Sequence, residues 1–166
     1  MPQPTILIVD DELAIRESFT LILEDQARII SVATGEAAVK RFADESVDLV
    51  FLDIRMPGMD GIEVLKRIKA IDSSVPVVMV TAVNDVQKAS ACVRAGAFDY
   101  IVKPFDIDHI LEMARQLIAR RRRQHLMSEM EPQAPRLWSG QTKPARDLKE
   151  KLTQAAAEDR PLLFVG

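Results

Sequence analysis

The chain has 166 residues, 48% of them hydrophobic, so it can bury the core of one packed domain and still leave a further segment. Its single cysteine excludes an intrachain disulfide and a metal site built from cysteines. The sequence shows neither a signal-peptide pattern nor an apolar run of about 18 residues, which predicts a soluble, cytoplasmic protein without membrane contact.

Five short apolar runs, rich in β-branched residues, predict strands at residues 5–9, 27–32, 47–53, 75–81 and 99–103. Their apolar residues follow one another without alternation, so we expect strands that are covered on both faces, as in a parallel sheet.

Helical spacing of apolar residues between these runs predicts helices at 12–24, 35–43, 61–71, 85–95 and from 106 onward. Asp85 and Asp106 are candidate N-caps, and Gly96 stands where a helix-ending glycine is expected. Five strand–helix units predict an α/β fold, a (βα)5 doubly wound parallel sheet.

The pattern and the charge both change after Ile118. Residues 1–119 carry 12 Lys and Arg against 19 Asp and Glu, whereas residues 120–166 carry 10 against 6. We therefore predict a first domain at 4–119, a linker helix and loop at 120–137, and a short α/β fragment at 138–166. The four arginines at 120–123 are interpreted as a solvated helix surface or a linker contact, and no DNA contact is predicted, because no recognition motif accompanies them.

Polar residues gather at the ends of four predicted strands. Asp10 and Asp11 end the first strand, Asp53 the third, Thr81 the fourth and Lys103 the fifth. In a doubly wound sheet these ends lie at one edge, which is where the functional site is expected.

Three carboxylates with one lysine leave negative charge uncompensated, and hard oxygen ligands suit Mg²⁺. Asp53 could then act as a nucleophile toward a phosphoryl group and form an acyl phosphate. Taken singly, these residues have simpler structural explanations. Asp10 and Asp11 could cap a helix, Asp53 could be a turn residue, and Thr81 could be an ordinary strand residue.

Four motifs, in order, are similar to those of the receiver domain of two-component response regulators: VDDE at 9–12, FLDIRMPGMDG at 51–61, VTA at 80–82 and DYIVKPF at 99–105. The resemblance covers roughly residues 4–119. It implies the flavodoxin-like strand order 2-1-3-4-5.

The resemblance further implies that a sensor histidine kinase phosphorylates Asp53 in a Mg²⁺-dependent reaction. Mg²⁺ would be held by Asp10, Asp11, Asp53 and the backbone carbonyl of Arg55. Lys103 and Thr81 would contact the phosphoryl oxygens, and a cis peptide bond would precede Pro104.

Tyr100 matches the switch aromatic of the family, which moves together with the residue that matches Thr81. The resemblance implies that this movement remodels the face formed by the fourth helix, fifth strand and fifth helix. A homodimer is implied through that face or through the linker helix. A half-buried tyrosine without a switch role is the alternative for Tyr100.

The segment from Leu137 to Gly166 resembles the start of the AAA+ domain of NtrC-type activators of sigma-54 RNA polymerase. Gly166 would be the first glycine of its phosphate-binding loop, which suggests a domain cut at its start. The remaining ATPase motifs are absent, so the chain is predicted to be a phosphoacceptor switch and not an enzyme. In the full protein it would control oligomerisation, the ATPase and transcription.

Two other functions fit parts of the pattern. A haloacid-dehalogenase-like phosphatase also uses an aspartyl phosphate, but it places two acids two residues apart on its first strand, whereas Asp10 and Asp11 are adjacent. A flavodoxin-like cofactor binder needs a first loop rich in hydroxyls and glycine, and the carboxylates here would repel a phosphate.

Overall fold

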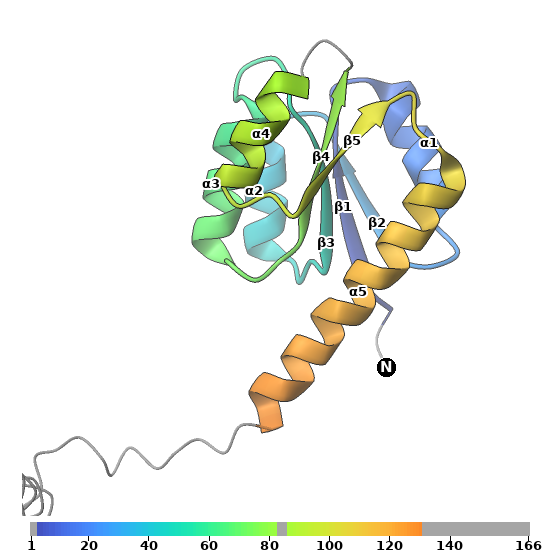
Figure 1. Ribbon diagram of the computed structural model, residues 1–166, viewed down its shortest axis with the longest axis vertical. Coiled ribbons are helices and arrows are strands. Elements are labelled where there is room, and N and C mark those ends of the chain that lie inside the picture. Colours follow the sequence, from blue (N-terminus) through green and yellow to red (C-terminus); the bar gives the residue numbers. More distant parts are fainter. Residues whose placement is uncertain (1–2, 83–85, 131–166) are drawn as a thin grey trace, which may run out of the picture. The chain divides into compact units, whose positions relative to one another are not determined.

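The computed structural model describes residues 3–82 and 86–130. They form a five-stranded parallel sheet in the order β2-β1-β3-β4-β5, which confirms the predicted fold class and strand order. The strands are β1 (Thr5–Val9), β2 (Arg28–Val32), β3 (Leu49–Asp53), β4 (Val77–Ala82) and β5 (Asp99–Lys103) (Figure 1).

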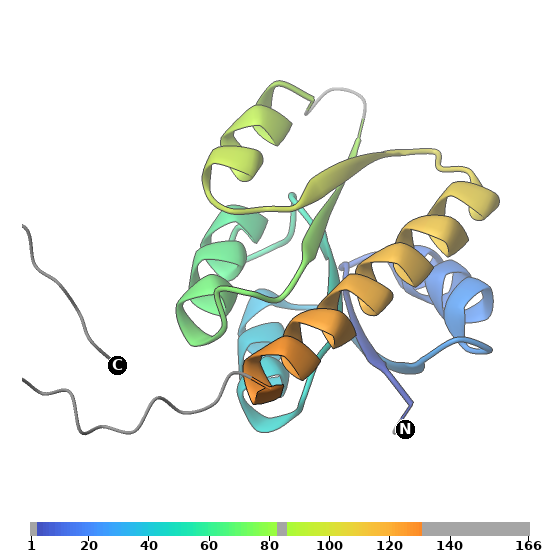
Figure 2. The same ribbon diagram turned by 60° about the horizontal axis from the view of Figure 1, so that its bottom comes forward.

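Five helices cover the two faces of this sheet. They are α1 (Leu13–Leu23), α2 (Gly35–Asp44), α3 (Gly61–Ile71), α4 (Val86–Arg94) and α5 (Ile107–Met130). Helices α2, α3 and α4 lie on one face, and α1 and α5 lie on the other (Figures 1 and 2). Each face has its own apolar cluster, one including Phe42 and Leu65 and the other including Phe19 and Ile110.

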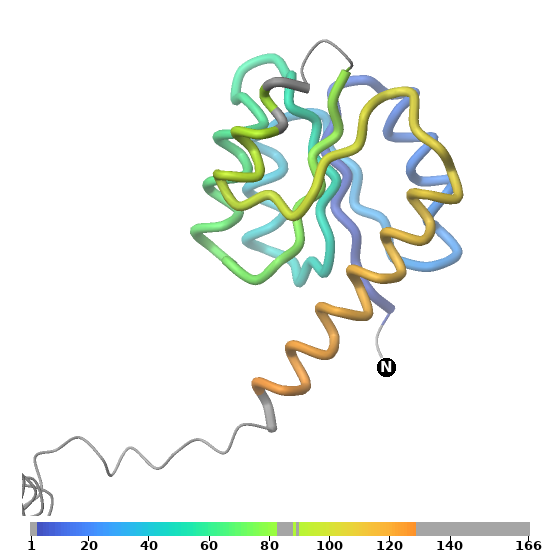
Figure 3. The backbone as a smooth tube through the Cα atoms, in the orientation of Figure 1, coloured from blue at the N-terminus to red at the C-terminus, as the bar shows by residue number. Residues whose placement is uncertain are grey.

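The central strands are buried on both faces, as their unbroken apolar runs predict. Every residue of β1 and β3 is buried, whereas the edge strands β2 and β5 are partly exposed. Because all the strands run in the same direction, their carboxyl ends lie at one edge of the sheet (Figure 3). The register pairs Asp53 with Val80 and Ala82 with Lys103, so the predicted polar residues share this edge.

The local signals around α4 and α5 are partly confirmed. The backbone N–H of His109 donates to the Asp106 carboxylate at 3.0 Å, so Asp106 caps α5. Gly96 follows α4 with a φ of 101°, a conformation that favours glycine. Asp85 and residues 131–166 lie outside the described residues, so the cap and the AAA+ fragment predicted there stay predictions.

Helix α5 continues through the four-arginine run without a break. Arg121 is only 4% exposed, so the expectation of a solvated surface is wrong at this residue. The run of four arginines does not indicate that one of its positions faces the protein interior.

Within the described residues, no helix has both the length and the apolar character needed to cross a membrane.

Candidate functional site

The carboxyl ends of β1 and β3 bring three carboxylates together. Asp10 and Asp11 follow β1, and Asp53 is the last residue of β3. One carboxylate oxygen from each residue lies within 4.8 Å of the other two. Asp10 and Asp53 are buried, whereas Asp11 is exposed and leaves the cluster open to solvent.

Lys103 is the last residue of β5, and its side chain extends from that strand to the acidic cluster. Its ammonium donates to Asp10 Oδ2 at 2.9 Å and to Glu12 Oε1 at 3.2 Å. It also lies 3.7 Å from Asp53 Oδ1. The peptide bond between Lys103 and Pro104 is cis, as the resemblance implied.

The surroundings of Asp53 disfavour its ionisation. Burial and the neighbouring charge of Asp10 raise its pKa from 3.8 to about 6, and Lys103 opposes the rise only in part. A single ammonium therefore leaves the negative charge of the three acids uncompensated. The carboxylate of Asp53 is still mostly ionised at neutral pH.

Two residues that sequence reasoning did not assign to the site hold its first loop. Arg16 in α1 turns back and donates from Nη1 to the carbonyl oxygens of Asp10 at 2.7 Å and Asp11 at 3.0 Å. Glu12 precedes α1, and its side chain reaches Lys103 without capping the helix. The sequence offered only a weak signal, an arginine about one helical turn after the acidic triplet.

The loop after Asp53 is held close to the start of α3. The backbone N–H of Gly61 donates to the Ile54 carbonyl at 3.1 Å. A Cβ at Gly61 would lie 2.2 Å from the carbonyl oxygen of Asp53 and 2.9 Å from Ile54 Cα. Glycine is therefore required here by the close approach of the two backbones.

Thr81 and Tyr100 lie on β4 and β5, the two strands that follow β3 in the sheet order. Thr81 is fully buried near the end of β4, and its hydroxyl donates to the Ala82 carbonyl at 3.2 Å. Tyr100 is 38% exposed on β5. Arg55 follows Ile54 in the exposed loop after β3. The roles implied for these residues stay predictions.

The donor set suits a hard divalent cation. Asp10, Asp11 and Asp53 together supply three carboxylates, which are ligands that Mg²⁺ prefers. A cation there would also offset the repulsion and desolvation that raise the pKa of Asp53. The geometry thus combines an acidic cluster that suits a divalent cation, a buried carboxylate and a nearby ammonium.

Comparison with known proteins agrees with this geometry. The family described as "Response regulator receiver domain" matches residues 6–115. The chain is 42% identical to the regulatory protein AtoC of Escherichia coli K12 over 116 residues, which are 68% of this chain and 25% of AtoC. It is 36% identical to sporulation initiation phosphotransferase F of Bacillus subtilis over 119 residues, which are 71% of this chain and 96% of that protein.

A solved structure is also similar to the chain. NtrX from Brucella abortus, solved in complex with ADP, superposes with a TM-score of 0.73 at 28% sequence identity. The match covers 93% of this chain but only 34% of NtrX. The chain therefore spans about a quarter to a third of these longer relatives.

Proposed function

The chain belongs to the response regulator receiver domain family, and from that premise we propose that it is a phosphoacceptor switch whose Asp53 receives a phosphoryl group from a sensor histidine kinase. The single observation that carries this proposal is the position of Asp53. Its carboxylate is buried at the centre of a site that holds two further acids and an ammonium.

In the proposed reaction a carboxylate oxygen of Asp53 attacks the phosphorus of a phosphohistidine. The new O–P bond forms while the N–P bond breaks, and the histidine nitrogen leaves with the electron pair. Lys103 lies close enough to move from the acids to a phosphoryl oxygen, where its charge would stabilise the product. A pKa of about 6 keeps Asp53 ionised at neutral pH, as a nucleophile must be.

Asp10, Asp11 and Asp53, with the backbone carbonyl of Arg55, would hold Mg²⁺. When bound, Mg²⁺ supplies positive charge that neutralises the phosphoryl oxygens. The cluster of acids supports this assignment because three carboxylates beside one lysine favour a divalent cation over an anionic phosphoryl group alone.

Thr81 and Tyr100 are proposed to carry the switch. The Thr81 hydroxyl makes a neutral hydrogen bond of 3.2 Å to the neighbouring carbonyl, with which a charged phosphoryl oxygen would compete favourably. Tyr100 is partly exposed on β5, the strand next to β4, so it has room to turn when Thr81 moves. The phosphoryl group would thereby favour one of two conformers.

In a longer protein this receiver would control an AAA+ ATPase that acts on sigma-54 RNA polymerase, and through it transcription. The similarity of the chain to NtrX supports this setting, because NtrX is a longer protein, of which the chain covers 34%, and was solved in complex with ADP. A homodimer through the face of α4, β5 and α5, or through the end of α5, is the proposed assembly.

Incubation with a small phosphodonor such as acetyl phosphate tests the assignment. We expect one added phosphoryl group by intact mass, dependent on Mg²⁺ and abolished in Asp53→Asn. The matched control is Asp25→Asn, which changes an exposed acid remote from the site and should leave the reaction unchanged. Labelling that survives Asp53→Asn would contradict the assignment, and steady turnover of a phosphate ester would favour a phosphatase.

A further inference from the structure

Arg121 continues the buried stripe of α5 where an apolar residue would be expected. Ile110, Ala114 and Leu117 lie one helical turn apart along the buried face, and Arg121 takes the next position. Its neighbours Arg120 and Arg123 are exposed. Burying a guanidinium is costly unless it is paired, so this arginine requires a specific partner.

That partner is the loop between α3 and β4. Arg121 Nη2 forms an ion pair with Asp72 Oδ2, and Nη1 donates to the Ser74 hydroxyl. Asp72 in turn accepts from the Ser74 backbone N–H at 2.9 Å and from its hydroxyl at 2.7 Å. We call Arg121, Asp72 and Ser74 the Arg121 clamp. Burial opposes ionisation of Asp72, but hydrogen bonds from Arg121 and Ser74 outweigh it and lower its pKa to about 2.

Neighbouring contacts make the loop a firm support for the clamp. Lys69 donates to the carbonyl oxygens of Val75 at 2.6 Å and Ser73 at 3.2 Å, which holds the loop from the α3 side.

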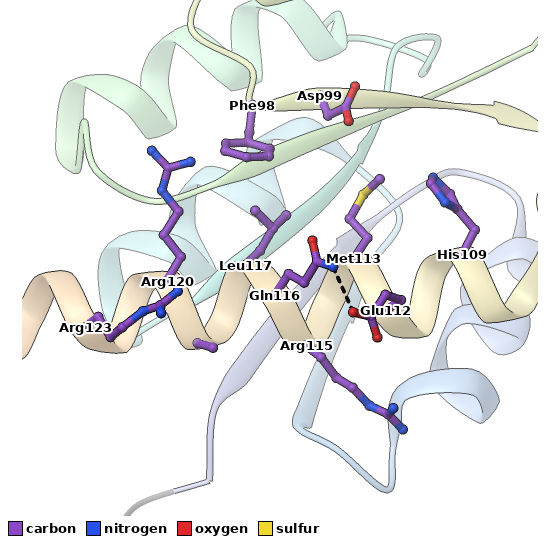
Figure 4. A pocket seen from close by; sticks show the side chains of 11 residues that line it. Phe98, Asp99, His109, Glu112, Met113, Arg115, Gln116, Leu117, Arg120 and Arg123 are labelled. Carbon is purple, nitrogen blue, oxygen red and sulfur yellow. Dashed lines mark hydrogen bonds between the residues drawn. The ribbon is translucent and has the colours of Figure 1, made fainter.

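The neighbouring Arg120 makes a second contact between α5 and the sheet. Its guanidinium lies 5.1 Å from the centre of the Phe98 ring, at the wall of a groove of about 740 Å³ between β5 and α5 (Figure 4). Two consecutive arginines therefore join α5 to the segments that precede β4 and β5.

The Arg121 clamp lies away from the phosphoacceptor. Its residues Asp72 and Ser74 precede the first residue of β4, whereas Asp53 and Lys103 lie at the carboxyl ends of their strands. The six residues of β4 span roughly 20 Å at about 3.3 Å per residue. No residue of the clamp is among the acids or the ammonium of the site, so the proposed phosphorylation does not use it.

We propose that Arg121 is a positioning residue that fixes the direction of α5 beyond the apolar core. Residues 123–125 are exposed, so among the described side chains of this stretch Arg121 makes the last buried attachment. Without it the buried part of the helix would end at Leu117 and Ile118, and the exposed Arg120 would keep its contact with the Phe98 ring beyond them. Any transmission of the state of the receiver through this helix rests on the proposed function, whereas the anchoring by Arg121 does not.

Stability is a poor test of this role. Removing one partner of a buried ion pair leaves the other charge uncompensated and lowers stability, whatever the pair does for the direction of α5. The Nε of Arg121 has no hydrogen-bond partner among the described residues. The direct measurement is therefore orientation. Spin labels at Glu17→Cys in α1 and Gln124→Cys in α5, both exposed sites, report the distance between the two helices in a Cys92→Ala background.

We expect a narrow distance distribution in the otherwise unaltered chain and a broader or shifted one in Arg121→Met. Asp72→Asn should broaden it in the same way, and the double variant should be no broader, because both changes open one contact. Arg121→Lys should restore the distribution only in part, since an ammonium cannot make the forked contact. Arg123→Met, an exposed arginine of the same run, is the matched control and should change nothing.

Amide hydrogen exchange provides a second measurement if Arg121→Met folds poorly. In Asp72→Asn, residues 118–125 should exchange about tenfold faster or more, while the strands keep their protection. An unchanged distribution in Arg121→Met, or unchanged exchange in Asp72→Asn, would overturn the proposal.

Measuring the phosphorylation of the same variants by a phosphodonor distinguishes failure of this proposal from failure of the proposed function. All clamp variants should be phosphorylated to the level of the unaltered chain, and a selective loss in Arg121→Met would overturn the separation of clamp and site. If the unaltered chain is not phosphorylated, the proposed function fails, while the distances measured without phosphodonor still decide the role of Arg121.

Discussion

The ammonium of Lys103 lies 2.9 Å from the carboxylate of Asp10, although the two residues are 93 positions apart in the sequence. It is nearer to Asp10 than to Asp53, which lies 3.7 Å away. Burial works against the charge of Lys103, but Asp10 and Asp53 outweigh it and raise its pKa. In this conformation Lys103 therefore balances an acid of the proposed metal site, and under the proposed function it would shift toward a phosphoryl group on Asp53.

Glu12 is expected to slow that shift. Its carboxylate is an additional partner of Lys103 at 3.2 Å and is not one of the three clustered acids. We predict that Glu12→Gln raises the initial rate of phosphorylation by a small phosphodonor by about two- to fivefold, because an exposed ion pair contributes about 0–1 kcal/mol. Glu17→Gln, an exposed change elsewhere on α1, should have no effect. An unchanged or lower rate in Glu12→Gln would show that Glu12 does not restrain Lys103.

Asp53 should make folding dependent on pH in the acidic range. Its folded pKa of about 6 lies above the unfolded value of 3.8, so between these values the folded protein keeps a proton that the unfolded chain has lost. Stability contributed by this group is therefore lost as the pH rises through about 4 to 6.

We predict that Asp53→Asn raises the free energy of unfolding by about 1–3 kcal/mol near pH 7.5 with a chelator present, and by much less near pH 4.5. Urea unfolding at both values, with Mg²⁺ excluded, measures the difference. Added Mg²⁺ should stabilise the unaltered chain more than the variant. An equal gain in the free energy of unfolding at both pH values would contradict the raised pKa of Asp53 as its cause.

Asp11 is expected to act in metal binding and not in folding. It is exposed, and its negative charge adds to the repulsion among the acids. We predict that Asp11→Asn weakens Mg²⁺ binding by about tenfold or more, measured by titration of the phosphate-free protein, and leaves it as stable or more stable. Asp25→Asn should bind Mg²⁺ normally. Unfolding of Asp11→Asn would instead identify these acids as structural caps.

The sequence was sufficient to predict the strands, the helices and the grouping of the acids at the carboxyl ends of the strands. Apolar runs and helical spacing are local signals, and parallel strands necessarily bring their carboxyl ends to one edge. Asp10, Asp53 and Lys103 could therefore be grouped from their places at strand ends. The motifs of a known family then supplied the strand order and the cis bond before Pro104.

What escaped prediction depends on helix rotation and on contacts between distant segments. The run of four arginines shows no sign that Arg121 alone faces Asp72, since this follows from the phase of α5 against the sheet. The preference of Lys103 for Asp10 and Glu12 likewise follows from side-chain reach across the sheet edge. Such features need the tertiary structure, because charge in a sequence indicates exposure by default.

Gly61 provides the last test, because it couples a steric requirement to the chemistry of the site. A methyl group there would lie 2.2 Å from the backbone oxygen of Asp53, so the strand end or the start of α3 must move. We predict that Gly61→Ala lowers the free energy of unfolding by about 1–3 kcal/mol and slows phosphorylation of the remaining folded protein. The matched control is Gly96→Ala, which carries backbone strain at a φ of 101° but has its nearest side-chain neighbour at 3.7 Å. That control should cost about 1 kcal/mol of stability yet leave the rate of phosphorylation unchanged, since Gly96 is remote from the acids. Equal losses of rate in both variants would mean that phosphorylation follows overall stability and not the position of Asp53.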